Sequence, residues 1–133
     1  MMLRAGLLLM APLLLAAAPA APIAPTPPLP KKVDLGPDAY PDAAREAGLE
    51  GDIGFDLQID AKGVVTACDV TKGADLPSGM AADTCALAKA NWRFLPARDG
   101  AGQKVPGRLH YAIAFRISRR CPPQDGQTIC VFL

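Results

Sequence analysis

The sequence has few of the residues that catalysis or metal binding usually requires. Its 133 residues include one histidine, His110, which excludes a metal site built from several histidines. No glycine-rich loop is followed by Lys and Ser or Thr, and no two cysteines have the CxxC spacing of thiol-exchange proteins. We interpret His110 as an ordinary strand residue rather than a general base. We therefore expect the protein not to be an enzyme, and we expect no cofactor, metal ion or small-molecule substrate.

An excess of charge is missing as well. The chain has 14 basic and 13 acidic side chains, and no basic run extends beyond short pairs such as Lys31 and Lys32. Nucleic-acid binding depends on a basic surface. Nucleic acid is therefore not an expected partner.

The first twenty residues have the pattern of an export signal. Arg4 precedes an apolar run over residues 5–16 that Pro12 interrupts, and small residues follow up to Ala20. This pattern predicts a signal peptide over residues 1–20, cleaved near Ala20 and Ala21. The alternative is an uncleaved inner-membrane anchor that faces the periplasm, although the run is short for a helix that needs about 20 residues to cross a bilayer. Cleavage would remove only Arg4 among the charged residues, leaving 13 of each sign.

Four cysteines in a small exported chain predict two disulfides, for which three pairings are possible. Export and disulfides together indicate a periplasmic location. Residues 21–37 are rich in proline and should form an extended, semi-rigid spacer, or simply the leader that remains after cleavage. We expect a folded domain over residues 38–118 and a separate tail over residues 119–133.

Alternating apolar residues predict the strands of this domain. A short helix starting at Pro41 should end at Gly48, where a left-handed backbone is favoured. The first strand follows, with an apolar face and an acidic face. A turn over residues 60–63 leads to a second strand, in which a bulge between Val65 and Cys68 interrupts the alternation. The apolar face carries Ile53, Phe55, Leu57 and Ile59, and the opposite face carries Asp52, Asp56, Gln58 and Asp60. The alternating aspartates fit a solvated face, with cation binding as the alternative.

A helix over residues 80–92 and a third strand over residues 108–117 complete the expected fold. The helix should bury one stripe, and Trp92 and Phe94 are the largest core candidates, with an aromatic ligand platform as the alternative. We expect a loop over residues 98–104. The predicted fold class is α+β, with a small antiparallel three-stranded sheet, possibly four-stranded with the tail, packed on one main helix. The buried stripe comprises Ala81, Cys85, Ala88 and Trp92.

Several of these landmarks, in this order, resemble the C-terminal domain of TonB-family proteins. They are Tyr40-Pro41, Gly48 and Gly51 before the alternating strand, Asp60 and Gly63 in the turn, then Trp92-Arg93-Phe94-x-Pro96 and Phe115-Arg116-Ile117. The resemblance covers roughly residues 38–118. It implies a TonB-like fold and a recognition module that binds the TonB box, a short extended segment of outer-membrane transporters.

The binding mode that the resemblance implies is β-augmentation, in which the peptide adds a strand to an open sheet edge. We place this edge on the third strand, at Arg108, His110, Ala112, Ala114 and Arg116. Residues 36–39 do not match the glutamine-containing run that precedes Tyr-Pro in the family, and residues 5–21 lack a polar residue for coupling to a motor. The alternative function is therefore a soluble periplasmic structural or interaction protein that has kept the fold and lost energy transduction.

The cysteines and the tail carry the last predictions. Cys68 should point into the core from the second strand and Cys85 from the helix, so we predict that these two pair. Cys121 and Cys130 would then close the tail into a hairpin. Residues 128–133 are apolar and β-prone. They should either return as a fourth strand that caps the binding edge or remain a mobile tail that leaves the edge open.

Overall fold

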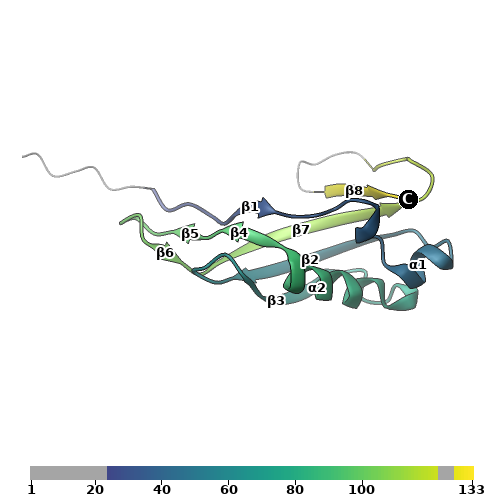
Figure 1. Ribbon diagram of the computed structural model, residues 1–133, viewed down its shortest axis with the longest axis horizontal. Coiled ribbons are helices and arrows are strands. Elements are labelled where there is room, and N and C mark those ends of the chain that lie inside the picture. The colour runs from purple at the N-terminus through teal and green to yellow at the C-terminus, as the bar shows by residue number, and fades with distance from the viewer. Residues whose placement is uncertain (1–23, 123–127) are drawn as a thin grey trace, which may run out of the picture.

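A computed structural model describes residues 24–122 and 128–133; the predicted signal peptide and most of the expected tail turn lie outside the described residues. The helical elements are η1 (Pro37–Ala39), α1 (Asp42–Glu46), η2 (Pro77–Gly79) and α2 (Met80–Asn91). The strands are β1 (Leu29–Lys32), β2 (Gly51–Ile59), β3 (Val65–Lys72), β4 (Arg93–Leu95), β5 (Ala97–Arg98), β6 (Lys104–Val105), β7 (Gly107–Arg116) and β8 (Thr128–Phe132). A four-stranded sheet of order β3-β2-β7-β8 forms the centre (Figure 1).

The β2–β3 hairpin forms as the alternation predicts. Asp60 stabilises its turn, because Oδ1 accepts hydrogen bonds from the amides of Lys62 at 2.8 Å and Val64 at 3.0 Å. Gly63 has φ +84°, and a Cβ atom there would lie 1.9 Å from the carbonyl oxygen of Phe94. The turn therefore requires glycine both for its backbone conformation and for space. A register shift next to Gln58 confirms the predicted bulge in β3.

β2 pairs with β7 along the whole length of β2, antiparallel, from Gly51 opposite Phe115 to Ile59 opposite Gly107. This confirms the predicted third strand. The tail returns as a fourth strand, β8, which pairs with β7. β8 runs parallel to β7. The turn of the hairpin expected within the tail lies largely outside the described residues. A parallel neighbour requires the chain to travel back before it pairs, and the connection from Arg116 to Thr128 is about as long as such a return needs.

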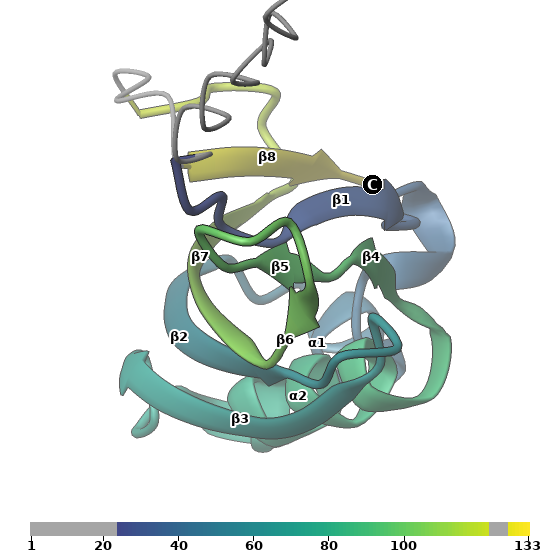
Figure 2. The same ribbon diagram turned by 90° about the vertical axis from the view of Figure 1, so that its left-hand side faces the viewer.

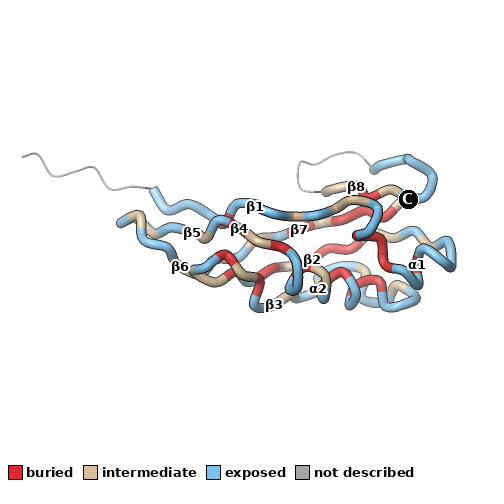
Figure 3. The backbone as a smooth tube through the Cα atoms, in the orientation of Figure 1, coloured by how far each residue is buried: buried red, intermediate tan, exposed pale blue. Residues whose placement is uncertain are grey.

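The core lies between the sheet and α2, as the helical stripe predicted. Ala81, Cys85, Ala88 and Trp92 are all buried, and Figure 3 shows buried positions concentrated on β2, β7 and α2. Trp92 is fully buried, and its ring centroid lies 5.9 Å from that of Phe55 and 5.5 Å from that of Tyr111. Phe94 is 2% exposed. The alternative of an aromatic ligand platform is therefore wrong, since neither ring reaches the surface.

The α1 region also agrees with the sequence, with small differences at the ends. Pro41 is the N-cap of α1 rather than its first residue, and Ala47 ends the helix. Gly48 follows with φ +64°, as predicted. Tyr40 packs edge-on against Phe115 at 5.1 Å between ring centroids, so this short helix is attached to the sheet through its flanking residue.

Two small ribbons were not predicted. β1 pairs with β4, so part of the proline-rich segment expected to be a spacer lies against the domain (Figure 2). Pro28 is buried, and a Cβ atom on Gly107 would lie 2.7 Å from its Cγ. β5 and β6 pair within residues 97–105, where the sequence predicted a loop. Among the described residues, no helix has the length and apolar character needed to cross a membrane.

Candidate functional site

The candidate site is the outer edge of β7, by which we mean the side of β7 that faces away from β2. β8 pairs with this edge over residues 112–116, with Ala112 opposite Thr128 and Arg116 opposite Phe132. The sequence left open whether the tail would cover this edge, and the structure places β8 on it. Among the residues described, no strand pairs with the outer edge over residues 107–111.

The predicted edge residues thus fall into two groups. Arg108 and His110 lie in the part of β7 without a strand on its outer edge, whereas Ala112, Ala114 and Arg116 lie beside β8. All five point to the sheet face opposite the core-facing Tyr111, Ile113 and Phe115, as alternation requires.

Two small side chains on this second face, Ala112 and Ala114, accommodate the chain that follows β7. Ala114 is fully buried although it faces away from the main core. Ala112 lines a hollow of about 180 Å³ together with Asp52, Lys72 and Pro122. Pro122, which follows β7, therefore lies over this face next to Ala112. Ala112 and Ala114 are small residues at alternate positions of a strand whose other residues are mostly large. This pattern is a sequence signal that a segment packs over this face, and sequence reasoning missed it.

Charged residues on the same face are paired with one another. Arg116 Nη2 donates to Asp52 Oδ1, and Lys72 Nζ lies 3.7 Å from Asp52 Oδ2. His110 Nδ1 lies 2.7 Å from Asp56 Oδ1 on the opposite strand. Since Asp60 caps the β2–β3 turn, each of the three alternating aspartates has a protein partner. No group of three or more potential metal-binding side chains is found among the described residues.

Glu50 fixes the end of β7, a role that sequence reasoning also missed. Its Oε1 accepts hydrogen bonds from the amides of Ile117 at 2.7 Å and Ser118 at 3.0 Å. These bonds lower the pKa of the exposed carboxyl group. The hydrogen bond from the Val64 amide lowers the pKa of Asp60 in the same way. Burial raises the pKa of Tyr40 and of Tyr111.

Two disulfides flank the site, in the pairing expected from the sequence. Cys68 on β3 is bonded to Cys85 on α2, with 5.7 Å between Cα atoms, and attaches the helix to the sheet. Cys121 is bonded to Cys130 in the middle of β8, with 6.1 Å between Cα atoms. Both spacings fall in the range of ordinary disulfides.

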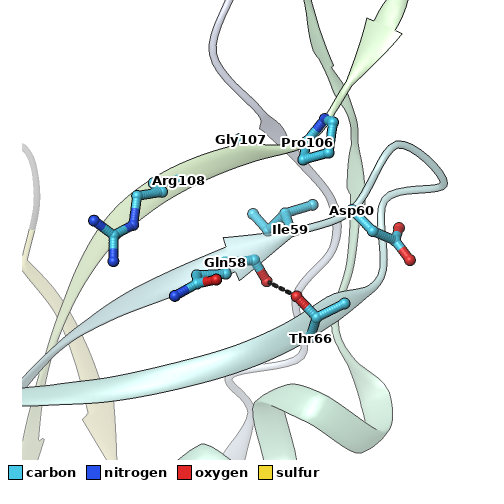
Figure 4. A pocket seen from close by; sticks show the side chains of 7 residues that line it. All are labelled: Gln58, Ile59, Asp60, Thr66, Pro106, Gly107 and Arg108. Atoms are coloured by element: carbon cyan, nitrogen blue, oxygen red, sulfur yellow. Dashed lines mark hydrogen bonds between the residues drawn. The ribbon is translucent and has the colours of Figure 1, made fainter.

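A hollow of about 440 Å³ lies at the turn end of the sheet, beside the start of β7 (Figure 4). Thr66 Oγ1 donates to the Gln58 carbonyl at 3.2 Å within it, and Asp60 and Arg108 lie at opposite ends. Its lining contains no cysteine or histidine, and its one acid, Asp60, is engaged by backbone amides. This lining offers no nucleophile with an adjacent base.

The fold and the edge define a class: a small α+β domain whose sheet accepts a further strand on β7. The family model of the Gram-negative bacterial TonB protein C-terminal domain matches residues 37–117, and the chain belongs to this family. The resemblance inferred from the sequence is thus confirmed, and β8 lies beyond the matched residues. A comparison with curated proteins gives no match.

A solved structure agrees with this assignment. The chain is similar to the solution NMR structure of the Pseudomonas aeruginosa TonB C-terminal domain, with 26% sequence identity and a TM-score of 0.51. The similarity covers 71% of this chain and 90% of that one. The shared fold confirms the predicted α+β class.

Proposed function

We propose that this domain is a periplasmic recognition module that binds the TonB box of an outer-membrane transporter by β-augmentation, in support of energy-dependent transport. The outer edge of β7, with Arg108, His110, Ala112, Ala114 and Arg116, is the surface that receives the peptide. The supporting observation is β8 itself, because five consecutive residues of β7 already pair with an added strand there.

This mode of binding relies on backbone hydrogen bonds, so side chains contribute mainly to selectivity. The charged side chains on the face of β7 opposite the core are already paired, which agrees with a binding mode based on the backbone. Arg116 and His110 are engaged by aspartates of β2, which leaves the backbone of β7 as the principal binding group. No nucleic acid and no small-molecule substrate is part of this proposal.

The test is a binding titration of the full mature chain with synthetic peptides from the TonB boxes of transporters in the same organism. The control is the same peptide with alternate residues replaced by proline, which removes backbone donors without adding charge. Binding of the unmodified peptide alone, with shifts of β7 amide resonances, is the expected result. Equal binding of both peptides, or shifts confined to β3, would contradict the proposed site.

A second candidate function is a periplasmic interaction protein that has kept the fold without a transporter partner. The observation that favours it is the coverage of residues 112–116 by β8. An uncleaved inner-membrane anchor fits only the transducing function, whereas a cleaved signal peptide favours the interaction protein. Mass spectrometry of the exported protein distinguishes them, because a chain without residues 1–20 cannot transmit force from the inner membrane.

A further inference from the structure

β8 occupies the very edge that an incoming peptide would need. It pairs with residues 112–116 of β7, and beyond the strand the amide of Leu133 donates to the Arg116 carbonyl at 3.2 Å. The family match ends at residue 117. The strand on this edge is therefore supplied by a part of the chain outside the matched domain.

β8 is packed into the fold through its side chains. Val131 is 1% exposed and belongs to the core, and Ile129 packs against the same cluster. The two point to the same side, as alternate residues of a strand do. β8 therefore fills apolar space beside β7 as well as satisfying its backbone.

The Cys121–Cys130 disulfide holds this strand in place. Cys130 is the central residue of β8, opposite Ala114, and Cys121 follows the end of β7. The start of the connecting segment is fixed in turn by Glu50, which binds the amides of Ile117 and Ser118. A strand tethered so closely has a high effective concentration at its own edge. An external peptide has to compete with it.

We propose that β8 is a built-in competitor for the β7 edge and that the Cys121–Cys130 disulfide is its latch, which a dithiol opens by reduction. This inference rests on the proposed function for its biological meaning. In the reaction the Sγ–Sγ bond breaks, each sulfur takes up a proton, and the dithiol loses two electrons to become a disulfide. Cys121 is exposed, whereas Cys85 of the other disulfide is 8% exposed, so the latch is the more accessible bond.

β8 also defines what a competing strand must carry. To replace it, the strand must run parallel to β7 and place two apolar side chains, two residues apart, where Ile129 and Val131 lie. Opposite Ala112 and Ala114, β8 carries Thr128 and Cys130, so small or polar residues fit these two positions. An acidic or proline-containing segment would lack these properties.

The experiment uses a fluorescent peptide with the sequence of residues 128–133 carrying C130S, titrated against the full mature chain. The variants are C121A/C130A, which removes the latch, and Val131→Asp, which expels the strand. The controls are C68A/C85A, which removes the other disulfide, and Leu95→Asp, which adds the same charge at an exposed leucine on β4. NMR spectra confirm that each variant is folded.

We expect C121A/C130A and Val131→Asp to bind the peptide at least tenfold more tightly than the oxidised wild-type chain, and the two controls to bind like wild type. Mild reduction of the wild-type chain should reproduce the gain. Equal affinity of wild type and both opened variants, or no binding by folded opened variants, would overturn the proposal. Binding of this peptide but of no TonB-box peptide by the opened variants would uphold the latch and refute the proposed transporter partner.

Discussion

The Cys68–Cys85 disulfide should contribute a large share of the domain's stability. The two residues are 17 positions apart. Closing a loop of this length lowers the entropy of the unfolded chain enough to stabilise the fold by about 3 kcal/mol. Small domains have total stabilities of about 5–15 kcal/mol. Replacing both cysteines by alanine should therefore remove a fifth or more of the total.

Urea unfolding followed by tryptophan fluorescence measures this loss directly. Trp92 is the single tryptophan and is fully buried, so its emission reports on the core between α2 and the sheet. With a slope of about 1–3 kcal/mol per molar urea, the midpoint of C68A/C85A should fall by roughly 1–3 M. The slope should rise slightly, because the unfolded chain without the cross-link exposes more surface.

The matched control is C121A/C130A, whose cysteines are nine positions apart. The same entropy argument gives about 2.6 kcal/mol for it, but this disulfide secures β8 rather than the helix. Because the loop that it closes is shorter, the fluorescence midpoint should shift less than in C68A/C85A. The expected slope predicts a far larger shift than about 0.2 M. A midpoint for C68A/C85A within about 0.2 M of the wild-type midpoint would therefore refute the reasoning. So would a larger shift in the control.

Three further predictions concern single residues. Gly63→Ala should destabilise the domain by more than about 1 kcal/mol, and by more than Gly79→Ala, because both glycines have positive φ but of the two only Gly63 lies against a neighbouring carbonyl. Thermal unfolding followed by circular dichroism compares the two variants. Equal losses of stability would show that the clash at Gly63 is relieved. Trp92→Ala should lower the free energy of unfolding by on the order of 3–5 kcal/mol. Trp92→Phe should lower it clearly less, since the indole N–H has no hydrogen-bond partner that the change would leave unpaired. Equal melting temperatures for the two variants would contradict this prediction. In the folded state the pKa of Glu50 is lowered, so its stabilising effect is complete above the usual carboxyl pKa of 4.5 and is lost as the pH falls through the lower folded-state value. The urea midpoints of wild type and Glu50→Gln should therefore converge between pH 7 and pH 3. A constant difference between the two midpoints would exclude this mechanism.

The sequence predicted the elements whose formation depends on local pattern. β2 and β7 were predicted because one face of each strand is continuously apolar, and α2 because its buried residues recur at helical spacing. Gly48 and Gly63 marked turns because positive φ favours glycine. The pairing of the cysteines followed from these elements, since it needed only the faces on which Cys68 and Cys85 lie.

The features that the sequence did not predict depend on contacts between distant segments. Alternation cannot tell the direction of a short strand, so the parallel course of β8 was not foreseen. β1 lies in a proline-rich segment with no alternation, so no strand was predicted there. The packing of this segment against the domain is reflected only at Gly107, where Pro28 and Ala97 leave no room for a side chain. The coverage of the candidate edge was left open for the same reason, because it depends on where the tail returns.

The pairing of β2 with both β3 and β7 has a consequence for how quickly the chain can fold. β3 follows β2 after one short turn, whereas β7 is separated from β2 by α2 and the small ribbons. Closing the larger loop costs more entropy and slows the pairing. Until β7 arrives, the long apolar strand β2 has one unpaired edge, which is a template for association with other chains. We expect refolding yield to fall as protein concentration rises, with losses confined to the interval before β7 joins the sheet.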